Sequence, residues 1–396
     1  MSLYKGEQMN LKNILRVLRI LSTSMSFLLF SFAQAATYYV STSGSDSNAG
    51  TLAKPFKTIQ RGLDLARAGD TVMVRGGTYA GSVTFRYSGA SGRPITLQNY
   101  NGEKAIIDQG YSYTLKRDSN NVRRVTFNSL AGSTKPIGWI VIDGMEIMRG
   151  WDGIKFNNAY DVIIRGCNIH HNLSQGLVGN GLRITLDRNI VANNSNAKWR
   201  GYPSTTNQLH GIYLSGTSHK IINNVIHSNL CHGIQAAGLS AQPEHYSSEY
   251  GGARNWLVAN NTFAYQKNCA AMTVYRQYAQ NMTIMNNIFY ENSKDIPGPN
   301  GISFYNSGSG HLVKNNLFYS SKNYAPIYTN VGIVYSLSAN LMQTKPLFVS
   351  ASGFNFRQLS SSPSINKGLK TTLIPWDFDK KTRPRGTTHD IGAFEY

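Results

Sequence analysis

Two histidines open two similar segments of the chain, and a tyrosine follows the first of them. His210 begins His-Gly-Ile-Tyr-Leu, which places Tyr213 three residues later, and His232 begins His-Gly-Ile-Gln-Ala. Imidazole and phenol groups can act as bases or acids when neighbouring charges and burial shift their pKa values. These two segments are therefore the first candidates for general acid–base chemistry.

Long polar insertions flank the two segments. One lies near residues 192–207, before the Tyr213 segment, and the other near residues 238–254, after the His232 segment. Long loops on a rigid scaffold often carry functional residues, so we expect a groove with the two segments as its floor and the insertions as its walls. Neutral growth of surface loops is the alternative. The candidates in these loops are Lys198 and Arg200 for catalysis, and Trp199, Tyr202, His245 and Tyr246 for substrate binding.

A repeat of about 22 residues positions these segments. An apolar–x–apolar pattern leads to an anchor residue, and a further apolar residue follows three positions later. The anchors are Gly144, Gly166, Asp187, Asn223, Asn260, Asn286 and Asn315, at spacings of 22, 21, 36, 37, 26 and 29. Short strands that recur with turns predict an all-β, single-domain solenoid, a right-handed parallel β-helix. A leucine-rich repeat is the alternative, but leucine does not dominate the pattern.

The strand before each anchor would form the floor of the groove. Alternation along a strand turns every second side chain outward. The outward row is Lys155, Val178, Tyr213, Gln235, Thr273 and Ser303, and the row two residues later includes Asn157, Asn180, Ser215, Tyr275 and Tyr305. Strands of adjacent coils lie about 4.8 Å apart, so His210 and His232 should be neighbours beside Tyr213. The substrate-binding candidates of the floor are Lys155, Gln235, Tyr275, Arg276 and Tyr305.

Two structural features follow from the same register. The stacked anchors Asn223, Asn260, Asn286 and Asn315 should bond their side-chain amides from coil to coil as an asparagine ladder. Cys231 and Cys269 hold equivalent positions in consecutive coils, about 5 Å apart, within the range that permits a disulfide. Free stacked thiols are the alternative, and Cys167 should be unpaired.

The first 35 residues have the layout of a secretory signal peptide. Basic residues precede an apolar run at 20–32, which ends in Ala-Gln-Ala at 33–35. The run is too short for a membrane span, so we expect a secreted or periplasmic monomer. Residues 36–330 should form the β-helix, with an N-terminal cap over 36–80 that contains a helix over 55–68. Residues 331–396 should form the last coils and a C-terminal cap or wrap.

Several motifs resemble the opening and the end of exported pectate-lyase-like β-helix proteins. They are Tyr-Tyr-Val-Ser-Thr-Ser-Gly-Ser-Asp-Ser-Asn-Ala-Gly at 38–50, Pro-Phe-Lys-Thr-Ile at 55–59, Ala-Gly-Asp-Thr-Val at 68–72, Gly-Gly-Thr-Tyr at 76–79 and Asp-Ile-Gly-Ala-Phe-Glu at 390–395. The resemblance implies a superfamily of lyases, epimerases and hydrolases that act on polyuronates and related glycans. It is specific for architecture and weak for activity.

The charge of the chain indicates an acidic partner. Without residues 1–35, the 39 basic and 20 acidic residues become 35 and 19, a formal charge of +16. An acidic polysaccharide suits such a protein and such a groove. Nucleic acid is disfavoured because the basic residues are scattered and no Lys/Arg-rich run occurs. Colloidal solubility alone is the other explanation of the charge.

The acidic residues argue against two kinds of mechanism. A glycoside hydrolase needs two carboxyl groups roughly 5–9.5 Å apart, whereas the groove strands offer Asp152 alone. A calcium-dependent lyase needs several oxygen ligands around one point, and these strands carry no Asp cluster. The histidines lack a local metal-ligand spacing. We therefore expect no cofactor, with calcium as the open alternative.

The remaining groups suit metal-free β-elimination of a uronate. Cations would neutralise the substrate carboxylate, one group would remove the C5 proton, and another would protonate the leaving O4. The candidates are His210, Tyr213, His232, Lys198 and Arg200. A C5-epimerase uses the same proton abstraction, and a non-catalytic glycan-binding protein would keep the same basic, aromatic groove. The sequence predicts an acidic-polysaccharide lyase and leaves these alternatives and a hydrolase open.

Overall fold

A computed structural model gives the structure of residues 34–110, 124–128, 135–195, 209–237, 250–276, 278–330 and 335–396. The elements described below belong to one unit, Ala36–Tyr396. Residues 1–33 of the predicted signal peptide lie outside the described residues. Within the described ranges, no helix combines the length and the apolar character that crossing a membrane requires.

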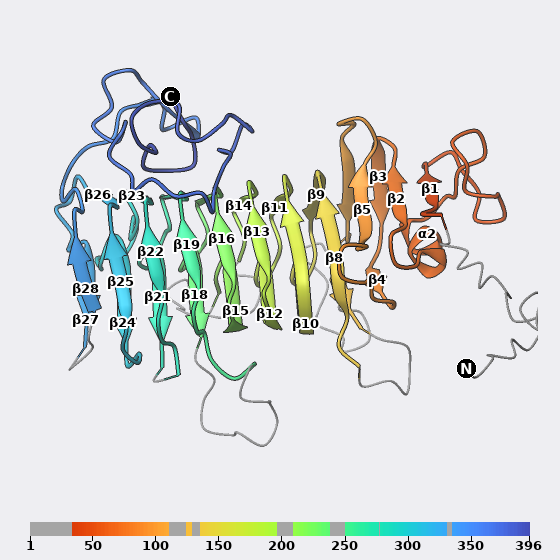
Figure 1. Cartoon of the computed structure of the whole chain (residues 1–396), viewed down its shortest axis with the longest axis horizontal. Coiled ribbons are helices and arrows are strands. Elements are labelled where there is room, and N and C mark those ends of the chain that lie inside the picture. Colours follow the sequence, from red (N-terminus) through yellow and green to blue (C-terminus); the bar gives the residue numbers. More distant parts are fainter. Residues whose placement is uncertain are drawn as a thin grey trace, which may run out of the picture. The chain divides into compact units, whose positions relative to one another are not determined.

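The chain winds through successive coils, and each strand pairs in parallel with its equivalent in the next coil (Figure 1). The first-strand line consists of β4 (Val83–Phe85), β7 (Val125–Phe127), the start of β10 (Ile154–Arg165), β12 (Leu177–Leu182), β15 (Ile212–Thr217), β18 (Ile234–Ala237), β21 (Met272–Tyr275), β24 (Ile302–Tyr305) and β27 (Ile327–Thr329). This line carries the predicted groove floor.

Two further lines complete the coils. The second-strand line consists of β1 (Thr37–Val40), β2 (Thr71–Val74), β5 (Ile95–Asn99), β8 (Gly138–Asp143), the end of β10, β13 (Thr185–Asp187), β16 (Lys220–Ile222), β19 (Leu257–Ala259), β22 (Thr283–Met285), β25 (His311–Lys314) and β28 (Tyr335–Ser338). The third-strand line consists of β3 (Gly77–Ala80), β6 (Ala105–Asp108), β9 (Met145–Met148), β11 (Asn168–His170), β14 (Ile190–Ala192), β17 (Val225–His227), β20 (Thr262–Ala264), β23 (Ile288–Tyr290) and β26 (Leu317–Tyr319).

Apolar side chains fill the interior of the coils. The inward residues of the groove strands from β10 to β24, Ile212 and Ile234 among them, are fully buried. Like residues stack on like: the Phe263 and Phe289 rings lie 5.1 Å apart, and Phe289 and Phe318 lie 4.8 Å apart. Stacked coils thereby bury a continuous core that a single coil could not.

The asparagine ladder lies one residue later than predicted. The amide nitrogen of each ladder residue donates to the side-chain oxygen of the next, through Asn189, Asn224, Asn261, Asn287, Asn316 and Asn340. A second ladder, absent from the prediction, runs through Asn172, Asn194, Asn229, Gln266 and Asn292. The turn explains the error, because the first Asn of each pair has φ near +55° and its side chain leaves the interior.

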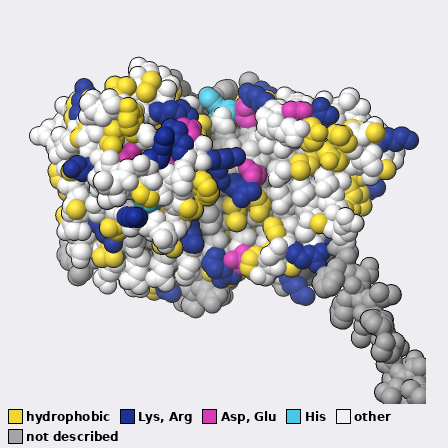
Figure 2. All heavy atoms as spheres, turned by 45° about the horizontal axis from the view of Figure 1, so that its top comes forward, with side chains coloured by type: hydrophobic (Ala, Val, Ile, Leu, Met, Phe, Trp, Pro, Cys, Tyr) yellow, Lys and Arg dark blue, Asp and Glu magenta, His cyan; other side chains and the backbone are white. Residues whose placement is uncertain are grey.

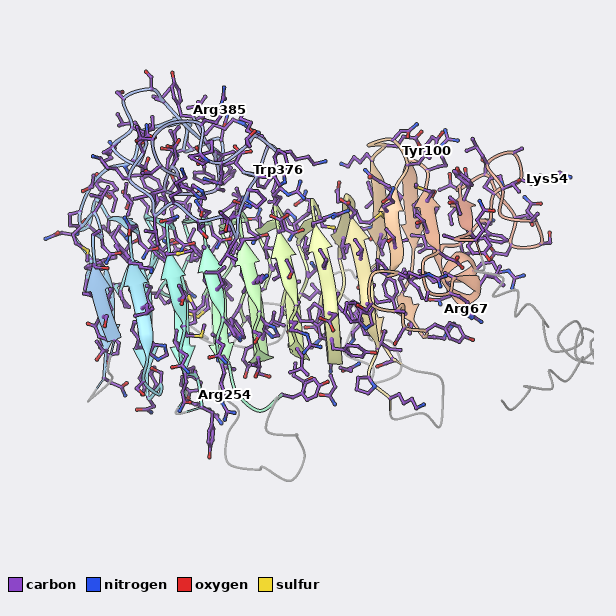
Figure 3. All side chains as sticks on the ribbon, in the orientation of Figure 1. Lys54, Arg67, Tyr100, Arg254, Trp376 and Arg385 are labelled. Atoms are coloured by element: carbon purple, nitrogen blue, oxygen red, sulfur yellow. A yellow bond between two sulfur atoms is a disulfide. The ribbon has the colours of Figure 1, made fainter. Side chains whose placement is uncertain are left out.

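The predicted row bonds from coil to coil only in part, with Asn223 donating to Asp187 and Asn286 donating to Asn260. Its residues also hold the C-terminal wrap, residues 345–396. Their side-chain amides donate to backbone carbonyls of the wrap: Asn223 to Trp376, Asn260 to Asp390, Asn286 to Leu369 and Asn315 to Lys367. In Figure 1 the wrap is the dark-blue segment beside the C label, and Figure 3 marks Trp376 and Arg385 on it. The turn asparagines therefore fasten the wrap to the coils.

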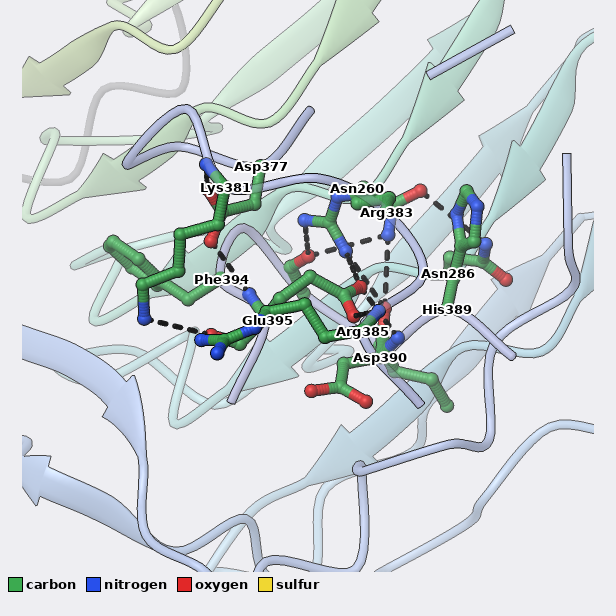
Figure 4. Close-up of polar contacts among 12 residues, drawn as sticks. Asn260, Asn286, Asp377, Lys381, Arg383, Arg385, His389, Asp390, Phe394 and Glu395 are labelled. Carbon is green, nitrogen blue, oxygen red and sulfur yellow. Dashed lines mark hydrogen bonds and ion pairs between the residues drawn. The ribbon is translucent and has the colours of Figure 1, made fainter. Parts of the chain in front are cut away.

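A buried ion pair organises the wrap itself. Arg383 and Glu395 are almost fully buried and bond at 2.5 Å, while the Asp390 N–H donates to Glu395 (Figure 4). The wrap also contains the antiparallel hairpin of β29 (Phe348–Ser350) and β30 (Asn355–Gln358). Phe356 of this hairpin joins an apolar cluster with residues of the third-strand line.

The N-terminal cap contains a shorter helix than predicted. Helix α2 spans Ile59–Leu65, because Thr58 caps its start and Ala66 is already extended. Ile59, Leu63 and Ala66 are buried, as predicted for one apolar face. The helix contacts β1, β2 and β4 at this end of the coils.

Cys231 and Cys269 form a disulfide, with their Cα atoms 4.7 Å apart. Cys167 is buried and free. The predicted stacking of Cys231 on Cys269 and the unpaired Cys167 are confirmed, and of the two alternatives left open for the stacked pair the disulfide is the one that forms. The separation shows that the predicted coil register is right at this corner.

Candidate functional site

The groove strands stack in the predicted register. Tyr213 of β15 pairs with Val178 of β12 on one side and with Gln235 of β18 on the other, and Gln235 pairs with Thr273 of β21. The register holds from β10 to β24, with one irregularity after Phe156. The outward row of the floor is therefore the one predicted from the sequence.

The two candidate histidines are direct neighbours. Their rings stack with centroids 5.3 Å apart, and the Tyr213 ring meets the edge of His210 at 5.6 Å. The Nδ1 atom of His232 lies 2.9 Å from the Ala270 carbonyl oxygen, which can only accept, so Nδ1 carries the proton and Nε2 keeps a lone pair. The buried Nδ1 of His210 has no hydrogen-bond partner among the described residues.

Burial keeps all three groups uncharged near neutral pH. It lowers the pKa of His232 to about 4, and burial together with the charge of His232 lowers the pKa of His210 well below 6.5. The pKa of Tyr213 is raised by burial, against the opposing effect of the nearby Arg276 cation. The imidazoles are therefore available as bases, and the phenol retains its proton for donation.

These residues line a hollow of about 740 Å³. Its other described lining residues are Gln235, Asn268, Cys269, Ala270, Thr273, Tyr275, Arg276, Ile296, Pro297, Gly298, Pro299, Ser303 and Tyr305. The segment 296–299 forms a side of the hollow that the sequence analysis did not predict. The interval between Asn286 and Asn315 is seven residues longer than 22, and this excess is the signal that could have revealed it.

An aromatic pair and a cation stand at one end of this hollow. The Tyr275 and Tyr305 rings stack at 5.6 Å, and the Arg276 guanidinium lies 5.2 Å from the centre of the Tyr275 ring. Arg276 has φ of +74° and makes no ion pair with a described residue. A guanidinium without a carboxylate partner is suited to binding an anionic ligand.

A second hollow of about 330 Å³ adjoins the first through Tyr213. It is lined by Lys155, Phe156, Asn157, Asn158, Val178, Gly179, Asn180, Leu214, Ser215 and Ala237. Asn158 and Asn180 bond across adjacent coils, because the irregularity after Phe156 shifts the asparagine row by one residue. The two hollows together follow the groove floor from β10 to β24.

Carboxylates are absent from the described lining of both hollows. Asp152, the candidate on the groove strands, is buried, and its carboxylate pairs with Arg124 at 3.1 Å. Burial raises the pKa of Asp152 against the opposing effect of Arg124. The described lining of the two hollows therefore offers neither the paired carboxyl groups of a hydrolase nor the set of oxygen ligands that calcium requires.

Several basic and acidic side chains elsewhere form ion pairs. Arg165 and Arg183 each bond to an aspartate exactly one coil earlier, Asp143 and Asp161 respectively. On the face in Figure 2, Asp and Glu side chains likewise lie beside Lys and Arg. Such pairs neutralise part of the basic surface, whereas Arg276 and Lys155, which line the two hollows, form no ion pair with a described residue.

Six candidates of the two predicted walls lie outside the described residues. They are Lys198, Trp199, Arg200, Tyr202, His245 and Tyr246. The second wall rejoins the coils at Arg254, which forms backbone bridges with Thr217 and Gln280 (Figure 3). Of the other histidines, His170 bonds to Glu146 and His171 on the third-strand line, away from the groove.

Residues 38–330 match the family model described as Pel9A-like, right-handed β-helix region. The chain belongs to this family. Its membership confirms the predicted resemblance and the right-handed parallel β-helix. The structure is similar to that of pectate lyase Pel9A, with a TM-score of 0.54 and 16% identity over 91% of this chain and 96% of the other.

Other similar proteins carry several names. A segment of 82 residues is 44% identical to pectate lyase PEL9 of Emericella nidulans, and one of 69 residues is 48% identical to the uncharacterized protein YwoF of Bacillus subtilis. These matches span 20% and 15% of the two relatives' lengths. A structure named glycoside hydrolase has a TM-score of 0.52 at 9% identity over 78% of this chain and 97% of the other. The shared fold alone therefore does not decide the reaction.

Proposed function

We propose that this protein is a polysaccharide lyase that cleaves an acidic, uronate-containing polysaccharide by β-elimination. The observation that carries the proposal is the meeting of His210, His232, Tyr213 and the unpaired Arg276 in one hollow, with no carboxylate in its described lining. Membership of the Pel9A-like family supports action on a polysaccharide, and the groove chemistry supports an acidic one.

Arg276 would bind the carboxylate of the uronate that undergoes cleavage. Neutralising that charge makes the neighbouring C5 proton more acidic, and the enolate-like transition state places still more charge near the guanidinium. The stacked Tyr275 and Tyr305 rings offer an apolar face to an adjoining sugar. Lys155 in the second hollow provides a further cation along the same groove.

His232 would be the base and Tyr213 the acid. The lone pair on Nε2 of His232 accepts the C5 proton, and the electrons of the C5–H bond form the C4–C5 double bond. The C4–O4 bond then breaks, and the Tyr213 hydroxyl donates its proton to O4 of the leaving chain. His210 stacks on His232 and holds its ring in place. Lys198 and Arg200 remain predicted contributors from the first wall.

The same hollow could serve epimerisation or binding without chemistry, and product analysis separates these outcomes. A lyase gives an unsaturated uronate with strong ultraviolet absorbance and a new reducing end. An epimerase exchanges the C5 proton with solvent without cleavage, a hydrolase gives reducing ends without the absorbance, and a binder gives neither. A panel of acidic polysaccharides, with neutral glycans beside them, identifies the substrate and the reaction together.

The residue assignment has its own test. Tyr213→Phe should lower kcat on the substrate by ~10²–10⁴-fold, the usual contribution of general acid–base catalysis, and His210→Ala should also lower it by orders of magnitude. Tyr328→Phe is the matched control, because Tyr328 pairs with Ser303 in the same row but lines neither hollow. Near wild-type kcat in both Tyr213→Phe and His210→Ala would refute the assignment.

A further inference from the structure

Four side chains of metal-ligand type converge behind the hollow. Among the described residues, His210, Cys231 and His232 each place a ligand atom within 4.8 Å of those of the other two. The Cys231 sulfur is bonded to that of Cys269, which also lines the hollow. Two imidazoles and two sulfurs therefore meet at the corner where β15, β18 and β21 begin.

Both histidines have the features of metal ligands. A ligating histidine usually donates its other ring N–H to a carbonyl or carboxylate, and the Nδ1–H of His232 donates to the Ala270 carbonyl. His210 is 1% exposed, and its Nδ1 has no hydrogen-bond partner within the part of the chain that the structure describes. A buried polar atom without a partner is costly unless something else binds it. A metal ion bound through Nδ1 of His210 would satisfy it.

The disulfide withholds the sulfur ligands. We propose that reduction of Cys231–Cys269 creates a Cys₂His₂ site for a divalent cation of the zinc class. A dithiol supplies two electrons and two protons, leaves as its own disulfide and yields two cysteine thiols. The cation then binds both sulfurs as thiolates, and the two thiol protons pass to solvent.

The geometry requires only a small closure. Zinc binds nitrogen at about 2.0 Å and sulfur at about 2.3 Å, so its tetrahedral ligand atoms lie roughly 3–4 Å apart. The ligand atoms of His210, Cys231 and His232 lie within 4.8 Å of one another, so these three need to close by at most about 1 Å. Reduction also frees the two sulfurs to move apart to that spacing. Local sequence spacing could not reveal the site, because its ligands come from three successive coils.

The site would act as a redox-gated inhibitor of the groove. A cation bound to Nε2 of His232 removes the lone pair that the proposed reaction uses. This consequence rests on the proposed function, whereas the binding of the cation does not. In the oxidised protein the sulfurs are bonded to each other, and Nε2 of His232 keeps its lone pair.

Cobalt binding to the full chain tests the site. The protein is reduced anaerobically with a dithiol, desalted and titrated with Co²⁺ beside the oxidised protein. The reduced protein should bind one Co²⁺ with tetrahedral visible bands and thiolate-to-cobalt charge transfer, and the oxidised protein should show neither. Cys269→Ser, which cannot form the bond, should show the charge-transfer band without reduction. Its single thiolate and the two histidines remain as ligands.

Matched variants fix the ligands. His232→Ala and His210→Ala should each weaken Co²⁺ binding by at least ~10-fold, the loss that follows even from removing the partner of a ligand. Cys167→Ala should leave binding unchanged. The proposal is overturned if the reduced protein and Cys269→Ser remain folded by circular dichroism without these bands, if both lose their fold, or if the oxidised protein binds equally well. The test measures cobalt binding directly, so its outcome does not depend on whether the protein is a lyase.

Discussion

The buried histidine His219 should make the β-helix sensitive to mild acid. It lies at the start of β16, is 1% exposed, and uses both ring nitrogens. Nδ1 accepts from the Ile184 N–H, and Nε2 donates to the Ser215 carbonyl. Only the neutral ring can make both bonds, because protonation would point a second N–H at the Ile184 N–H. His311 repeats the arrangement three coils later, with Met282 and Gly308.

The size of the effect follows from the pKa shift. Burial lowers the pKa of His219 to about 4, from an ordinary value of 6.5. The unfolded chain therefore binds the proton more readily, and stability falls as pH falls below 6.5 and levels off below about 4. One pKa unit corresponds to about 1.4 kcal/mol, so the full loss approaches about 3 kcal/mol, of which roughly 2 kcal/mol occurs between pH 7 and pH 5.

Urea unfolding of wild type and His219→Gln at pH 7 and pH 5 tests this reasoning. A glutamine side chain can accept from Ile184 and donate to Ser215 without titrating, so the loss of unfolding free energy between the two pH values should shrink by roughly 2 kcal/mol. His311→Gln should act similarly, and the double variant should be additive because the sites are three coils apart. An unchanged pH dependence in both single variants would refute the claim that these rings stay neutral in the fold.

Three further outcomes are expected. Asn261→Ala removes one member of the ladder and should lower the free energy of unfolding by about 1–3 kcal/mol, because buried amide groups lose their partners. Urea unfolding measures this loss, and a loss below measurement error contradicts the prediction. The kcat of the proposed lyase should stay level as pH falls from 7 to 5 and decline near pH 4, because His232 becomes protonated near its pKa of about 4. A decline in kcat centred at pH 6.5 contradicts this prediction. Arg276→Gln should raise KM for the acidic polymer and weaken its dependence on salt, since the attraction it removes is screened by ions; an unchanged salt dependence contradicts this role.

The row of groove residues was predictable because a strand has a fixed period. Once Ile212 and Ile234 are placed inward, alternation turns Tyr213 and Gln235 outward, and parallel pairing makes them neighbours. The same register brought Cys231 and Cys269 together. These predictions needed only the spacing of apolar residues and the distance between strands.

Turns and partners were not predictable in the same way. The ion pair between Asp152 and Arg124 removes the carboxylate from the groove. Arg124 precedes Gly144, the first anchor of the repeat, so the predicted register did not extend to it. Residues 296–299, which form one side of the hollow, belong to a coil that is only seven residues longer than 22. This excess length is small beside the two long insertions. A loop of irregular backbone has no repeat to place its side chains, so only its position along the coils could be expected.

The paired asparagines show how one tight turn gives two identical residues different structural roles. At Asn260 the left-handed backbone, with φ of +54°, sends the side chain out of the coil to the wrap, and Asn261 then points inward to the ladder. Because one tight turn sets both directions, the register of the ladder also sets the register of the wrap. A sequence with a single asparagine at each turn could hold the coils together or hold the wrap. The doubled residue lets the same corner do both, and this accounts for the repeated pair at 223–224, 260–261, 286–287 and 315–316.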